Sequence, residues 1–228
     1  MSPAAAVGPA EFGRRLADVR ARIGSAAPDP DRVTLVAVTK GFGPDAVRTA
    51  LAAGLTTLGE NYADELVTKA AGVTGHSGPA PQWHYLGAIQ RNKVARLAPL
   101  VACWQGVARI EEGRAIARHR PGSQVLVQVD VAGLPGRGGV PPEAVGALVD
   151  RLREEALDVA GLMAVGPPGP PEGARTGFRQ VTGLADGLGL PVRSMGMTDD
   201  LEVALSEGST MVRIGRALFG ERPPRPVP

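Results

Sequence analysis

Short apolar runs alternate with helical segments along most of the chain, and this alternation limits the possible folds more than any other feature. Eight runs have the length and composition of strands: residues 33–38, 56–58, 83–86, 101–105, 124–131, 157–163, 191–195 and 210–214. Between the first two, Val47, Ala50 and Leu51 share one helical face, and Gly54 suits a helix end. No hairpin signal joins the runs, so parallel pairing with helical crossovers is expected.

The simplest closed arrangement of eight such units is a (β/α)8 TIM-type barrel, preceded by a helix near residues 11–23. An open doubly wound sheet is the alternative. With 228 residues, one domain over residues 1–228 is expected, and the Pro-rich end from about residue 221 is expected to be a disordered tail.

Composition excludes several classes of protein. Hydrophobic content of 43% and charged content of 21% indicate neither a membrane span nor disorder. The 25 Lys and Arg against 23 Asp and Glu form no basic tract, so nucleic-acid binding is not favoured. Cys103 is the only cysteine, and the N-terminus does not resemble a secretory signal. A cytoplasmic location is therefore expected.

Two loops have an unusual composition. Residues 132–142 and 166–175 are rich in Gly and Pro, which predicts no regular structure in either. Both follow predicted strands and so belong to the face where barrel enzymes keep their active sites. Tolerated insertions are the alternative explanation, which is favoured for residues 166–175, and the sequence does not assign either loop a role.

The first predicted strand ends on a lysine, in the stretch "TLVAVTKGFGP". Lys40 is therefore placed at the carboxyl end of the strand, on the catalytic face of the predicted barrel. A nearby apolar core lowers the pKa of an amine, and a neutral lysine forms a Schiff base with a carbonyl compound. A lysine that extends into solvent is the alternative for this residue alone.

The loops after the seventh and eighth predicted strands have the composition of a phosphate site. Ser194, Gly196 and Thr198 lead into a helix N-terminus, where backbone N–H groups favour an anion. Gly215 permits a close approach of the backbone to a ligand. A tight turn and an ordinary helix start are the alternative. Because closure places the first and eighth strands side by side, an aldehyde joined to a phosphate, as in pyridoxal phosphate, fits both features.

Five motifs in order resemble one known family. They are "AVTKGF", "GENYADEL", "WHYLGAIQRNK", "GLMAVGPP" and "SMGMTDDLEVALSEGSTMVRIGRALFG". The sequence resembles the pyridoxal phosphate homeostasis proteins, whose single fold-type III barrel is similar to the N-terminal domain of alanine racemase. The resemblance implies that Lys40 carries pyridoxal 5'-phosphate as a Schiff base. It further implies a cofactor site of Lys40, Asn61, His84, Ser194, Gly196, Thr198, Arg213, Gly215 and Arg216, with no metal and no catalytic residue.

The implied roles differ in how well the residue types support them. Arg213 would face the pyridine nitrogen, and a permanent cation there disfavours protonation of the ring and weakens it as an electron sink. For His84, a core histidine is as compatible with the sequence as a ligand contact. For Asn61, the alternative to a ligand contact is a helix cap. Arg216 stands where the family more often has a small hydroxylic residue.

The resulting functional hypothesis is a carrier that buffers or delivers pyridoxal phosphate, with apo-enzymes as recipients and a monomeric state. An amino-acid racemase is the first alternative. It needs a second domain, for which the sequence up to Pro228 is expected to leave no room, and a second base, for which Tyr62 and Tyr85 are the candidates. A Schiff-base aldolase is the second alternative, and it lacks an acid or base beside Lys40 in the sequence.

Overall fold

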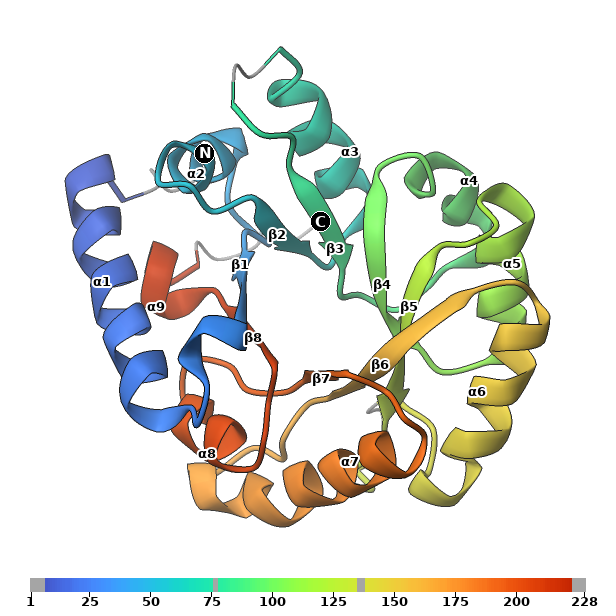
Figure 1. Cartoon of the computed structure of the whole chain (residues 1–228). Helices are drawn as coiled ribbons and strands as arrows, with labels where there is room; N and C mark the ends of the chain where they lie inside the picture. The colour runs from blue at the N-terminus through green and yellow to red at the C-terminus, as the bar shows by residue number, and fades with distance from the viewer. Residues whose placement is uncertain (1–6, 76–77, 135–137, 223–228) are drawn as a thin grey trace.

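Eight parallel strands close into one barrel in the computed structural model, which describes residues 7–75, 78–134 and 138–222 (Figure 1). The strands follow one another around the barrel in sequence order, and β8 pairs with β1. They are β1 (Thr34–Val38), β2 (Thr57–Glu60), β3 (Gln82–Tyr85), β4 (Val101–Val107), β5 (Gln124–Val129), β6 (Asp158–Ala164), β7 (Val192–Ser194) and β8 (Met211–Ile214).

Helices surround the ring of strands on the outside (Figure 1). They are α1 (Pro9–Ala26), α2 (Pro44–Ala52), α3 (Ala63–Gly72), α4 (Val94–Leu97), α5 (Ile110–His119), α6 (Val145–Glu154), α7 (Arg175–Gly187), α8 (Leu201–Ser206) and α9 (Arg216–Phe219). Short 3₁₀ turns lie between the elements: η1 (Pro30–Arg32), η2 (Arg91–Lys93), η3 (Pro142–Ala144) and η4 (Pro171–Ala174). Within the described ranges, none of the helices combines the length and the apolar character that a membrane span requires.

The structure confirms the predicted barrel and all eight predicted strands. Pairing of Thr34 with Met211 and of Ala37 with Ile214 closes the sheet and excludes the open doubly wound alternative. The predicted bounds differ from the observed ones by a few residues. Most of the predicted tail, residues 223–228, lies outside the described residues, and the single domain and the cytoplasmic location stay predictions.

The prediction that both Gly- and Pro-rich loops lack regular structure is wrong in part. The loop at 166–175 contains η4, because prolines fit the first turn of a helical segment, where no backbone N–H is needed. In the loop at 132–142, Val140 forms a parallel bridge with Val129, while residues 135–137 lie outside the described residues.

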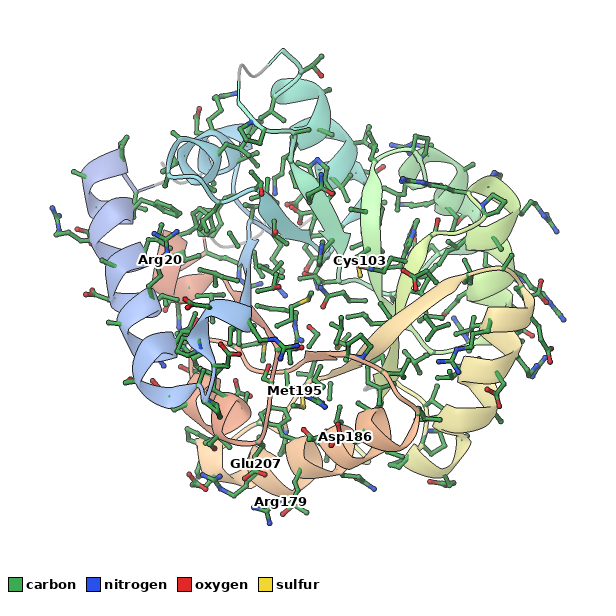
Figure 2. The ribbon with its side chains drawn as sticks, in the orientation of Figure 1. Arg20, Cys103, Arg179, Asp186, Met195 and Glu207 are labelled. Carbon is green, nitrogen blue, oxygen red and sulfur yellow. The ribbon has the colours of Figure 1, made fainter. Side chains whose placement is uncertain are left out.

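Two apolar layers hold the barrel together. The larger lies between the strands and the helices, and the smaller contains Val36, Cys103, Leu126, Ala160, Met163 and Met211. On β1, Val36 belongs to the smaller layer and the next residue, Ala37, to the larger one, as expected when alternate side chains of a strand face opposite sides. Side chains fill the ring enclosed by the strands, so the barrel is a packed core and not a pore (Figure 2).

The additional helix α1 supports the loop that follows Lys40. Figure 1 shows α1 beside α8 and α9. Phe12 of α1 packs against Phe219 of α9 with ring centroids 5.2 Å apart, and Phe219 packs against Phe42 at 5.5 Å. Because Phe42 lines the cavity described below, this aromatic row connects the N-terminal helix to the functional face.

Replacing Phe12, which is fully buried, tests this support. Phe12→Ala should lower the free energy of unfolding by about 3–5 kcal/mol, because it removes a packed ring and leaves a cavity. The exposed Leu134 is the control, and Leu134→Ala should change stability by about 0.5 kcal/mol or less. Equal effects of the two substitutions in urea denaturation would show that α1 does not contribute to the core.

Candidate functional site

A cavity of about 290 Å³ opens at the carboxyl ends of the strands. Six of the nine residues predicted for the site line it, namely Lys40, Asn61, Thr198, Arg213, Gly215 and Arg216. They come from the ends of β1, β2, β7 and β8, segments that the closure of the barrel brings together. Their contact with a ligand stays a prediction, but the structure does place them around one space.

The cavity wall is rich in positive charge. Lys40, Arg213, Arg216 and Arg222 line it, and among the described lining residues the carboxylates are Asp199 and Glu221. An anion is therefore favoured in this space over a cation.

Lys40 differs from the other two lysines of the chain. Lys69 and Lys93 form ion pairs, whereas Lys40, two residues beyond β1, forms none within the part of the chain that the structure describes. Burial lowers the pKa of Lys40, the guanidinium groups of Arg222 and Arg213 lower it further, and Glu60 acts in the opposite direction. A lower pKa increases the fraction of neutral, nucleophilic amine at neutral pH.

A buried ammonium group holds the backbone on both sides of Lys40. Lys69 Nζ donates hydrogen bonds to the Thr39 carbonyl at 2.8 Å, to Glu60 Oε2 at 2.5 Å and to Glu65 Oε2 at 3.0 Å. The same oxygen of Glu65 accepts a hydrogen bond from the backbone N–H of Gly41 at 2.8 Å. The residues before and after Lys40 are thus both tied to one buried network.

Sequence reasoning missed Lys69, although a signal was present. Ala63, Leu66 and Lys69 are three residues apart in α3, so they share one face of the helix, and all three are buried. A lysine on the apolar face of a helix needs a buried counter-ion. Here that partner is Glu60, whose carboxyl pKa lies above its usual value because the effect of burial outweighs the lowering by Lys69.

Asn61 presents an unsatisfied acceptor at the cavity. Its side-chain oxygen Oδ1 is buried and has no hydrogen-bond partner among the described residues. The N-cap of α3 is Tyr62, and no side-chain cap hydrogen bond is formed there, so the helix-cap alternative for Asn61 is not supported. A buried amide without a partner is costly, and a ligand in the cavity would supply one.

The loops after β7 and β8 are joined to each other and to α1. Arg216 forms an ion pair with Asp199, and the backbone N–H of Ala217 donates to Thr198 Oγ1 at 3.3 Å. From outside, Arg22 of α1 donates to the Thr198 carbonyl at 2.9 Å. These contacts hold Thr198 and Arg216 on one side of the cavity.

Arg213 is a buried cation that, within the described chain, donates its side-chain hydrogen bonds to uncharged acceptors. Its guanidinium donates to the Ser194 carbonyl at 2.6 Å, to Ser194 Oγ at 2.7 Å and to the Ala164 carbonyl at 2.8 Å. Burial lowers the pKa of Arg213 to about 10, against a raising effect of Asp200, so the group is still positively charged at neutral pH.

The remaining three predicted site residues lie behind the cavity wall. His84 and Ser194 are buried and hydrogen-bonded to Gln105. Gly196 has φ +91°, its carbonyl accepts from the Arg213 backbone N–H at 3.0 Å, and a Cβ there would lie 2.6 Å from the Ala204 methyl group. Direct contact of these residues with a cofactor stays a prediction, and their positions favour a supporting role.

The family model for the N-terminal domain of alanine racemase matches residues 15–223 of the chain. The chain belongs to this family. The pyridoxal phosphate homeostasis protein of Pseudomonas aeruginosa is 38% identical over 223 residues, covering 92% of this chain and 96% of the relative. That of Deinococcus radiodurans is 36% identical over 211 residues, covering 90% and 97%. The chain is thus similar to the pyridoxal phosphate homeostasis proteins over most of its length and theirs.

Solved structures of family members have the same barrel. PipY of Synechococcus elongatus PCC7942, solved with PLP bound, is 29% identical with a TM-score of 0.81, and the match covers 92% of this chain and 100% of PipY. Alanine racemase from Corynebacterium glutamicum is 16% identical with a TM-score of 0.67, and the match covers 92% of this chain but 60% of the racemase. The likeness to the racemase shows the fold alone.

Removing the buried ammonium tests its place in the site. Lys69→Met should lower the free energy of unfolding by about 3–5 kcal/mol in urea denaturation, because Glu60 is left buried without a counter-ion. Adding Glu60→Gln to this variant should recover part of the loss, since it removes the unpaired charge. Lys93→Met, which breaks a partly exposed ion pair, is the control and should cost about 1 kcal/mol or less. A small effect of Lys69→Met, equal to that of the control, would contradict the assigned role.

The buried imidazole predicts a pH dependence of stability. Burial lowers the pKa of His84 from 6.5 to about 4, so between these values the unfolded chain binds the proton and the folded chain does not. Stability from His84 is therefore fully present above pH 6.5 and is lost as pH falls. Relative to His84→Gln, the wild-type chain should lose about 3 kcal/mol of unfolding free energy between pH 6.5 and pH 4. Parallel pH profiles of the two proteins in urea denaturation would show that His84 titrates normally.

Proposed function

We propose that this chain binds pyridoxal phosphate reversibly on Lys40 and serves pyridoxal phosphate homeostasis by holding the cofactor and releasing it to recipient enzymes. The observation that carries the proposal is the position of Lys40. It is a half-buried lysine with a lowered pKa and no ion pair in the described chain, at the mouth of a cavity rich in cations. The names of the relatives, and PLP bound to PipY, support it.

The residues present fit this cofactor. Arg216 and Thr198 stand on the side of the cavity where a phosphate is expected, and Arg213 offers a buried cationic donor to an acceptor within it. The unsatisfied Oδ1 of Asn61 marks a position for a polar ligand group; with the amide rotated, its NH₂ would donate there instead.

The bound cofactor supplies an aldehyde, which condenses reversibly with a primary amine and releases one water. Lys40 contributes the amine, and its lowered pKa keeps part of the group neutral so that its lone pair can attack the aldehyde carbon. Lys69 and Glu65 keep the backbone around Lys40 in place. When an incoming amine, such as a lysine of a recipient enzyme, takes its place, Lys40 regains a free amino group.

The positive charge of Arg213 favours a protein that holds the cofactor over an enzyme that uses it to convert amino acids. A group with a pKa of about 10 gives up its proton far less readily than a carboxylic acid, so Arg213 does not protonate a ring nitrogen and leaves the ring a weak electron sink. The titratable lining residues other than Lys40 and the arginines are Asp199 and Glu221, both on the side of Arg216. Among the described lining residues, no tyrosine or histidine stands ready as the second base of a racemase or the acid of an aldolase.

Replacing Lys40 separates covalent from non-covalent binding. Lys40→Ala should abolish the covalent absorbance band that forms when pyridoxal phosphate is added, while the free energy of unfolding changes by about 1 kcal/mol or less, since the side chain lies beyond the strand. Lys93→Ala is the matched control and should keep the band. A Lys40→Ala protein that retains the band would place the attachment elsewhere.

A second assay separates the carrier from the racemase and the aldolase. Loaded wild-type protein should transfer the cofactor to an apo-enzyme that needs it, measured as regained activity of that enzyme. It should show no Lys40-dependent racemisation or carbon–carbon cleavage on the same timescale. Fast turnover of an amino acid without transfer would favour an enzyme instead.

A further inference from the structure

The segment that follows α9 borders the cavity. Residues 220–222 come directly after this helix, and all three line the cavity together with Lys40. Gly220 has φ +84°, a conformation that glycine adopts without strain. Phe219, immediately before it, is buried and packs against Phe42. The segment therefore starts from an anchored residue and continues along the same space as the reactive lysine.

Arg222 contacts the residue next to Lys40. Gly41 has φ +80°, and a Cβ placed on it would lie 3.3 Å from Arg222 Cδ and 3.5 Å from Arg222 Cγ. The alkyl part of Arg222 therefore covers the position that a side chain at residue 41 would occupy. The backbone N–H of Gly41 donates to Glu65 Oε2 at 2.8 Å, so the backbone under Arg222 is itself held in place.

The guanidinium of Arg222 has no carboxylate partner among the described residues. Arg216, on the same cavity wall, differs in this respect, because it pairs with Asp199 and lies 3.7 Å from a carboxylate oxygen of Glu221. The two carboxylates that line the cavity are thus engaged with Arg216. The positive charge of Arg222 is left unpaired beside Lys40, on an exposed side chain.

The charges around Lys40 act mainly against its protonation. Burial lowers the pKa of Lys40, and among the charged groups Arg222 lowers it more than Arg213 does. Glu60 acts in the opposite direction, but its carboxylate is already paired with Lys69. The nearest effective charge is therefore a cation that comes from outside the barrel strands.

We propose that Arg222, seated on Gly41, is a positioning residue that keeps positive charge beside Lys40, so that the lysine gives its proton to water and reacts as a free amine at neutral pH. The inference rests on the proposed function and deepens it, because it makes the segment after α9 control how fast Lys40 reacts with an aldehyde. An arginine that serves packing on Gly41 alone is the competing explanation, and it predicts no change in the pH dependence of Lys40.

Reductive methylation of the full-length chain with formaldehyde and cyanoborohydride tests the inference without the cofactor. The neutral amine attacks formaldehyde and one water leaves; a hydride from cyanoborohydride and a proton from water then convert the imine to a methylamine. Because formaldehyde is uncharged, the rate reports the fraction of neutral amine and not the attraction of an anion. Peptide mass spectrometry follows Lys40, and Lys93 in the same digest is the internal reference.

Removing the charge should slow the reaction of Lys40 only where its protonation matters. Arg222→Gln should lower the methylation rate of Lys40 at pH 7 by about two- to fivefold, the effect expected of one solvent-exposed charge. The difference should shrink as the pH is raised toward about 10, where the neutral amine predominates in both proteins. It should also shrink in about 1 M salt, which screens exposed charges. Arg222→Lys keeps the charge and should restore most of the wild-type rate.

Arg20→Gln is the matched control. Arg20 is an exposed arginine of α1 outside the cavity lining, and its replacement should leave the rate of Lys40 unchanged (Figure 2). A rate that Arg222→Gln leaves unchanged or increases overturns the inference, and so does a loss that is the same at every pH and salt concentration. Neither result bears on the proposed function, which fails if the folded wild-type chain forms no Schiff base with pyridoxal phosphate.

Discussion

Pairing of the first strand with the eighth is the contact on which the whole site depends. The register places Val36 opposite Arg213 and Ala37 opposite Ile214, so the residues that follow each strand emerge side by side. Lys40 and Gly215, which are far apart in the sequence, line one cavity for this reason. In an open sheet the same residues would stand at separate edges. Closure of the barrel is therefore both a folding event and the step that assembles the site.

Three basic residues near the cavity differ in how their charge is paired, and the difference indicates which of them serve the fold and which serve the cavity. Lys69 is buried and paired with Glu60, so its charge is used within the fold. Arg213 is buried with uncharged partners, and its charge is left for the cavity. Lys40 is half-buried and, within the described chain, unpaired, which favours the neutral amine. The protein thus neutralises the ammonium that supports the backbone, whereas Lys40 and Arg213, which line the cavity, have no carboxylate partner within the described chain.

The fold and the outline of the site could be predicted from the sequence, because they depend on local patterns. Apolar runs mark the strands, and the position of Lys40 directly after one of them places it on the functional face. Behind the cavity wall the sequence reveals less. The contact of His84 and Ser194 with a ligand stays a prediction, and the hydrogen bonds of both side chains to Gln105 could not be predicted, because the direction of a side chain at a strand end depends on tilt and register, which the residue types do not reveal. Gln105 was missed because a polar residue within an apolar segment has a function that only its spatial partners disclose. Lys69 was missed although its spacing with Ala63 and Leu66 already placed it on the apolar face of a helix.

The central claim, reversible attachment of the cofactor to Lys40, has one direct test. Wild-type protein is incubated with pyridoxal phosphate, reduced with borohydride, digested and analysed by peptide mass spectrometry. Because the chain has three lysines, the modified position is unambiguous. The account predicts a pyridoxyl adduct on Lys40 and none on Lys69 or Lys93. An adduct confined to Lys93, or no adduct with the protein folded and saturated with cofactor, would contradict it.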